Sequence, residues 1–175
     1  MLNPQLVHES MLKEKSYYLK NGDKVQIQIA SDLDVENIMA IQKSSYDGKA
    51  PWGRLTVYNE LQNIQSFFLI VNYHGEGLAF IALSLRKDRL HITNVATKIA
   101  YQKQGLGSLL LENAIHLAKE LELNQLSLEV RVSNHSAKRL YRKLGFEDRY
   151  IKKNYYTDDR EDALEMYYQI KKEER

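Results

Sequence analysis

The middle of the chain carries three apolar, β-prone segments in close succession. They span residues 67–71, 78–85 and 90–97, and two turn signals, at 74–77 and 86–88, separate them. Strands joined by such short turns pair antiparallel, because a parallel pair needs a long crossover connection. The segments therefore predict a three-stranded antiparallel meander at the centre of the fold.

Other helix and strand patterns surround this meander. A period-two alternation over residues 24–29 indicates a half-buried strand. Apolar residues recur at helical spacing from Leu106 to Leu121 and predict an amphipathic helix that packs on the sheet. The remaining expected helices run from the Ser31-Asp32 cap signal to the break at Tyr46-Asp47-Gly48, over 54–63, and from the Ser133-Asn134 cap signal through residue 144, where Gly145 ends the helix. The remaining expected strands span 125–132, start at Phe146 and span 163–170.

The order of these elements predicts an α/β (α+β) domain. The expected sheet is mixed, mostly antiparallel and six- to seven-stranded, with helices on both faces. No linker divides the 175 residues, so we expect one domain over 23–171. Residues 1–22 show no sustained period and are expected to form an N-terminal extension of uncertain structure.

Composition excludes several classes of function. Lysine plus arginine number 25 and aspartate plus glutamate 23, so no direct nucleic-acid binding is expected. The absence of cysteine excludes a disulfide framework, a cysteine nucleophile and thiolate zinc ligation. The sequence shows no signal peptide and no membrane-spanning run, and a cytoplasmic location is expected. Nothing in it indicates an oligomeric state.

A glycine-containing turn, residues 102–107, precedes the amphipathic helix. The first N–H groups of a helix have no partner within the helix, and glycine lets a phosphate approach the backbone. Lys103 can add a positive charge. The alternative is a simple tight turn, since short glycine motifs often occur by chance. The sequence lacks the P-loop pattern, and Leu110 stands where a dinucleotide-binding turn needs a small residue.

Several motifs resemble the GCN5-related N-acetyltransferase (GNAT) superfamily. Gln102-x-x-Gly105-x-Gly107 matches its Q/R-x-x-G-x-G/A signature. Further motifs resemble the bacterial ribosomal-protein alanine N-acetyltransferases of the RimI type: Pro51-Trp52, Leu128–Asn134, Leu140-Tyr141, Leu144–Phe146, Lys153–Tyr156 and Arg160–Ala163. The resemblance covers about Val25 to Ile170.

This resemblance implies a GNAT fold and a reaction. Acetyl-CoA would be the cosubstrate, no metal would take part, and the N-terminal amine of a ribosomal protein would be the acceptor. The implied cofactor-binding residues are Val95, Ala96 and Thr97 along the pantetheine arm, Lys103, Gln104, Gly105, Leu106, Gly107 and Ser108 at the pyrophosphate, and Asn134. The implied catalytic residues are Glu129 as general base and Tyr141 as general acid.

Both catalytic candidates also have ordinary interpretations. Glu129 alternates with Leu128 and Val130 and so lies on the opposite face of its strand, where a glutamate commonly faces solvent. Tyr141 follows Asn134 by about two helical turns, so both can point at one ligand. Packing between helix and sheet is nevertheless the commoner place for a tyrosine.

Other features leave alternatives open. The oxyanion would be met by N–H groups of residues 95–97 if an irregularity there leaves one unpaired. The five histidines lack metal-ligand spacing and are expected at the surface or in packing, and Lys152-Lys153 with Tyr155-Tyr156 fit either a peptide-binding wall or simple β-propensity. The acceptor could instead be a small-molecule amine or a lysine side chain. A noncatalytic CoA-binding partner module is the alternative from another class.

Overall fold

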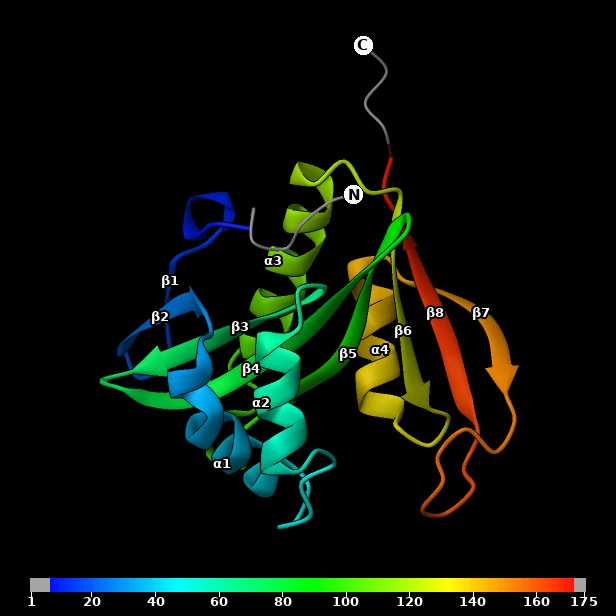
Figure 1. Cartoon of the computed structure of the whole chain (residues 1–175), viewed down its shortest axis with the longest axis horizontal. Coiled ribbons are helices and arrows are strands. Elements are labelled where there is room, and N and C mark those ends of the chain that lie inside the picture. The colour runs from blue at the N-terminus through cyan, green and yellow to red at the C-terminus, as the bar shows by residue number, and fades with distance from the viewer. Residues whose placement is uncertain (1–6, 172–175) are drawn as a thin grey trace.

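One sheet of eight strands organises the computed structural model, which describes residues 7–171 (Figure 1). The strands are β1 (Ser16–Tyr18), β2 (Lys24–Ile29), β3 (Ser66–Tyr73), β4 (Glu76–Arg86), β5 (Arg89–Thr97), β6 (Gln125–Arg131), β7 (Glu147–Lys152) and β8 (Ala163–Gln169). The helices are α1 (Val35–Ser45), α2 (Arg54–Gln62), α3 (Leu106–Glu120) and α4 (His135–Leu144). The expected fold class is confirmed, including the meander β3-β4-β5.

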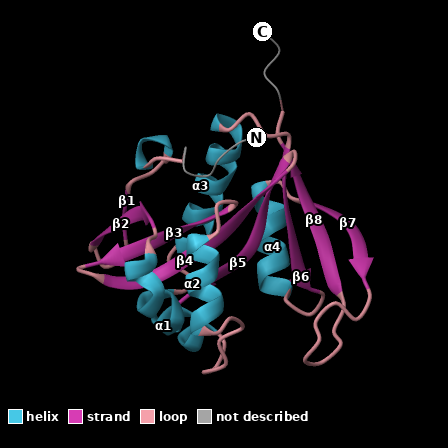
Figure 2. Ribbon diagram, viewed as in Figure 1, coloured by secondary structure: helices cyan, strands magenta, loops and turns pink. Residues whose placement is uncertain are grey.

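Strand pairing creates a gap in the middle of the sheet. The strand order is β1-β2-β3-β4-β5-β6-β8-β7, and β5 with β6 is the one parallel pair among the described strands. That pair is short, because it runs only from Arg89–Gln125 to Ile92–Leu128. Beyond it the two strands diverge, as Figure 2 shows. Ligands bind to sheets of this kind where neighbouring strands separate.

Helices cover both faces of the sheet, as the apolar patterns predict. On one face α1 and α2 enclose a smaller cluster around Phe68 and Phe80, whose rings stack 5.9 Å apart. On the other face α3 and α4 cover a larger cluster that includes Leu126 and Leu128 of β6. The alternation in β6 therefore directs Glu129 away from the α3 side of the sheet.

The helix ends follow the capping signals in the sequence. Ser31 forms a reciprocal capping box with Asp34 at the short helix that leads into α1. Asn134 caps α4, its side chain accepting the N–H of Ala137. Gly145 ends α4 with a φ of 106°, a left-handed conformation that glycine adopts without strain.

The N-terminal extension adds a strand that the sequence pattern does not reveal. β1 pairs antiparallel with β2, and Val7, Leu12 and Leu19 are buried in the larger core cluster. The expectation of six to seven strands is therefore wrong, because the sheet has eight and the additional one is this edge strand. Its three residues are too few for a period-two pattern to be recognised. Within residues 7–171, no helix has the length and apolarity needed to cross a membrane.

Candidate active site

The free edge of β5 forms one side of the gap between β5 and β6. On its other side β5 pairs with β4, but Thr93 is an extra residue between the pairs Ala82–Asn94 and Leu83–Ile92. This bulge lies two residues before Val95, so the irregularity precedes the 95–97 segment in which we expected it. From Thr93 to Thr97 no described strand pairs with the edge that faces β6. Backbone groups along this edge can therefore bind an extended ligand arm.

The turn before α3 presents a set of free donors. Within the described residues, the backbone N–H groups of residues 103–108 form no hydrogen bond. Lys103 and Gly105 have positive φ angles of 59° and 85°. Lys103 is exposed and forms no ion pair within residues 7–171. A cluster of main-chain donors at a helix N-terminus, with a neighbouring cation, suits a diphosphate.

Glu129 lies in a buried ionic network and is not the exposed glutamate of the ordinary interpretation. Its side chain is only 9% exposed. Lys152 Nζ donates to Glu129 Oε1 at 2.8 Å, and His91 Nε2 lies 2.8 Å from Glu129 Oε2. Burial acts to raise the pKa of Glu129, but the hydrogen bonds from His91 and Lys152 outweigh it and lower the pKa to about 2. Glu129 is therefore a carboxylate throughout the neutral pH range.

Two partners of Glu129 were not identified from the sequence. His91 is buried, and its Nδ1 lies 2.6 Å from the hydroxyl of Ser127. It faces Ser127 because residues 91 and 127 are opposite each other in the parallel β5–β6 register. Lys152 reaches the network from β7 and also lies 3.2 Å from the buried Glu165 of β8. No local pattern gives these contacts, since they depend on the strand order.

We expect Lys152→Met to destabilise the protein by about 2 kcal/mol at pH 7, because it leaves two buried carboxylates without their cation. The lowered pKa of Glu129 stabilises the native protein above about pH 4.5 and stops doing so as the pH falls through about 2. In the variant the carboxyls take up protons earlier. The stability difference should therefore shrink below about pH 4, as urea unfolding at several pH values would show.

Lys153→Met is the matched control for this prediction. Lys153 neighbours Lys152 and pairs with Asp162 at 2.9 Å, but its side chain is 78% exposed. Exposed ion pairs contribute about 0–1 kcal/mol. Equal losses in the two lysine variants would contradict the importance of the buried network.

Tyr141 is packed between α4 and the sheet. Its ring is 7% exposed, and its centroid lies 5.8 Å from that of Phe146. Burial raises the pKa of Tyr141 well above that of an ordinary tyrosine, with smaller contributions from Tyr46 and Tyr156. The hydroxyl makes no hydrogen bond to another described residue. The packing interpretation is correct for the ring, and the hydroxyl remains able to donate.

Residues from α1 and from the β7–β8 connection complete the surroundings of Tyr141. Tyr46, at the end of α1, donates to Asn94 Oδ1 at 3.3 Å. Burial raises the pKa of Tyr156 to about 12, Arg131 opposes the rise, and Tyr155, Glu129 and Tyr46 add to it. Tyr156 therefore lies within electrostatic range of both Glu129 and Tyr141. Asn134 is exposed at the start of α4, where its side-chain oxygen caps the helix.

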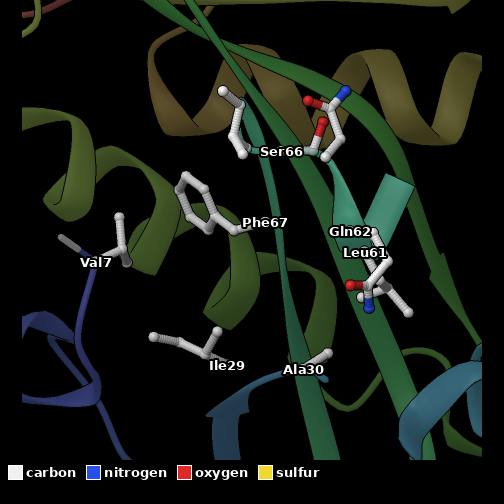
Figure 3. Close-up of a pocket in the computed structure, with 9 residues that line it drawn as sticks. Val7, Ile29, Ala30, Leu61, Gln62, Ser66 and Phe67 are labelled. Carbon is white, nitrogen blue, oxygen red and sulfur yellow. The ribbon is translucent and has the colours of Figure 1, made fainter. Parts of the chain in front are cut away.

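Two open pockets lie elsewhere on the described part of the molecule. Figure 3 shows a pocket of about 310 Å³ between the N-terminal segment, the end of α2 and the start of β3, lined by Val7, Ile29, Ala30, Leu61, Gln62, Asn63, Ile64, Ser66 and Phe67. A second, of about 360 Å³, lies beside Asp32, Val35, Glu36, Arg54, Leu55 and Tyr58. Neither contains the gap between β5 and β6. The first has no ionisable side chain in its lining, so it offers no group for acid–base chemistry.

Comparison with known proteins identifies relatives. The sequence profile of the Acetyltransferase (GNAT) family matches residues 35–146. A candidate [ribosomal protein bS18]-alanine N-acetyltransferase of Bacillus subtilis is 40% identical over 138 residues, which cover 78% of this chain and 90% of that protein. The crystal structure of the ribosomal-protein-S18-alanine N-acetyltransferase of Escherichia coli superposes with a TM-score of 0.77 at 31% identity, covering 86% of this chain and 97% of that one.

A more distant neighbour was crystallised with coenzyme A. The PaiA N-acetyltransferase of Thermoplasma acidophilum, in complex with coenzyme A, has a TM-score of 0.69 at 18% identity and covers 83% of this chain and 99% of that one. At this identity the likeness shows the fold alone.

Proposed function

The chain belongs to the acetyltransferase (GNAT) family and is an N-acetyltransferase, and on this premise we propose that it acetylates the N-terminal alanine of ribosomal protein bS18. The acceptor is suggested by the names of the relatives at 31–40% identity. The free N–H groups before α3, next to the unpaired edge of β5, are the observation that carries the assignment of the acetyl-CoA site. A cytoplasmic location is part of the same proposal.

The proposed acetyl-CoA site fits the residues present. Residues 103–108 would hold the pyrophosphate with main-chain donors, and Lys103 would add its charge. Residues 95–97 would hold the pantetheine arm along the free edge of β5. Bound there, acetyl-CoA supplies a thioester carbonyl that an amine can attack. The gap between β5 and β6 would then fix the direction of attack.

Glu129 would assist the acceptor amine by accepting a hydrogen bond, and would not itself keep the proton that the amine loses. An N-terminal amine has a pKa of roughly 7.7–8.0, so about a tenth is neutral near pH 7, whereas a lysine with a pKa of about 10.4 is almost entirely charged. With a pKa of about 2, Glu129 cannot retain a proton from either. Its carboxylate instead accepts a hydrogen bond from the amine or from a water, and the proton passes to solvent. This role favours an N-terminal acceptor over a lysine side chain.

Tyr141 would act on the departing thiolate. Complete proton transfer from an ordinary tyrosine, with a pKa of about 10, to a thiolate whose acid has a pKa near 8.5 is uphill by about 2 kcal/mol. Burial of Tyr141 makes the transfer harder still. The hydroxyl therefore stabilises the thiolate as a hydrogen-bond donor.

The proposed acceptor is tested by measuring the acetylation of the N-terminus of bS18. We expect the purified protein to acetylate bS18 and a peptide of its first residues on the N-terminal amine, and deletion of its gene to leave bS18 unacetylated, as intact-mass spectrometry would show. A peptide with a blocked N-terminus and a free lysine is the control. Unchanged bS18 acetylation in the deletion strain, or equal modification of the blocked peptide, would contradict this acceptor.

A further inference from the structure

The N-terminal strand β1 touches the proposed pyrophosphate loop. The hydroxyl of Tyr17 donates to the carbonyl of Gln104 at 3.1 Å, and the N–H of Lys20 donates to Gln104 Oε1 at 3.3 Å. The Tyr17 oxygen lies so close to Gly105 that a Cβ added there would be only 2.7 Å from it. A segment some 87 residues away in the sequence therefore packs directly on the turn.

This strand is held on both sides. Besides pairing with β2, it is fixed by the N–H of Ile27, which donates to the carbonyl of Lys15 at 2.9 Å. On the other side the N–H of Glu14 donates at 3.1 Å to the side chain of Asn113, a buried residue of α3. The segment that carries Tyr17 is therefore attached both to the sheet and to α3, the helix that follows the loop.

The hydrogen bond from Tyr17 sets the direction of a peptide unit. In a trans peptide, the carbonyl of one residue and the N–H of the next point in opposite directions. Because Tyr17 holds the carbonyl of Gln104 towards β1, the N–H of Gly105 points away from β1. That N–H is one of the free donors of residues 103–108. Fixing it before the ligand arrives lowers the conformational cost of binding.

We infer that Tyr17 is a positioning residue for acetyl-CoA, and that the N-terminal extension thereby belongs to the cosubstrate site. Tyr17 acts through the peptide between Gln104 and Gly105 and needs no contact with the ligand. The inference rests on the proposed function, because it assumes that residues 103–108 hold the pyrophosphate.

Tyr17→Phe tests the inference, because it removes the hydroxyl and keeps the ring in place. We expect the Kd and the KM for acetyl-CoA to rise about fivefold, the value of one hydrogen bond. The kcat and the KM for the bS18 peptide should stay unchanged. Calorimetry with acetyl-CoA and steady-state kinetics give these quantities.

Tyr18→Phe is the matched control. Tyr18 is the next residue on β1, is 63% exposed and forms no hydrogen bond through its hydroxyl within residues 7–171, so its change should leave every constant unaltered. If the Kd of Tyr17→Phe equals that of the native protein, the inference is overturned, whether or not the Tm of the variant is lower. Binding of acetyl-CoA by the native protein would still support the proposed site in that case. If the native protein itself does not bind acetyl-CoA, the proposed function fails first.

Discussion

Replacing Tyr141 by phenylalanine is expected to lower kcat about 100-fold and to leave the Kd for acetyl-CoA unchanged. The ring is buried against Phe146 and would stay in place, so the change removes only the hydroxyl. A donor aimed at charge that develops in the transition state contributes about 10²–10³-fold to the rate, and the same donor contributes little to binding the uncharged thioester. Single-turnover rates and calorimetry separate the two quantities.

Tyr168→Phe is the matched control for Tyr141→Phe. The Tyr168 ring lies 5.5 Å from Phe146, on the same aromatic cluster, and should tolerate the loss of its hydroxyl with native turnover. A parallel loss of turnover and of acetyl-CoA affinity in Tyr141→Phe would show that the hydroxyl supports the architecture of the site. Native turnover would remove Tyr141 from the mechanism.

Local sequence signals were sufficient for the framework of the fold. The alternation in β6 correctly separated the face of Glu129 from that of Leu128, and the signals at Ser31, Asn134 and Gly145 marked real helix ends. Each of these features depends on residues that are close together in the sequence. The periodicity of apolar residues and the capping of helices can therefore be predicted before any tertiary contact is known.

The environment of Glu129 could not be read in this way. His91 meets Ser127 and Glu129 through a parallel register between strands 36 residues apart, and Lys152 approaches across β8. These contacts decide whether the carboxylate has an ordinary or a lowered pKa. The roles of Glu129, Tyr141 and the loop residues remain predictions from resemblance, to which the structure adds their geometry.

Replacing Gly105 by alanine is expected to raise the Kd for acetyl-CoA about 30-fold. Its φ of 85° costs a residue with a Cβ about 1–2 kcal/mol, and that Cβ would lie only 2.7 Å from the Tyr17 hydroxyl. The contact is relieved either by a shift of the Tyr17 side chain, which breaks its hydrogen bond to Gln104, or by a turn of the peptide that Tyr17 holds. Both changes loosen the orientation of the free N–H groups. Calorimetry with acetyl-CoA would measure the loss, and thermal unfolding would report the accompanying fall in Tm.

Two alanine variants separate the causes of this effect. The family signature that Gly107 matches admits alanine at this position, an added Cβ meets no protein atom closer than 3.5 Å, and φ is not positive. Gly107→Ala keeps its N–H and should therefore bind acetyl-CoA nearly as the native protein does. Gly75→Ala has a similar positive φ of 82° in the β3–β4 turn with no neighbour within 4 Å, so it should lower Tm without changing the Kd. If Gly105→Ala resembles Gly75→Ala, the turn before α3 does not hold the pyrophosphate, because strain at that position would then affect folding alone.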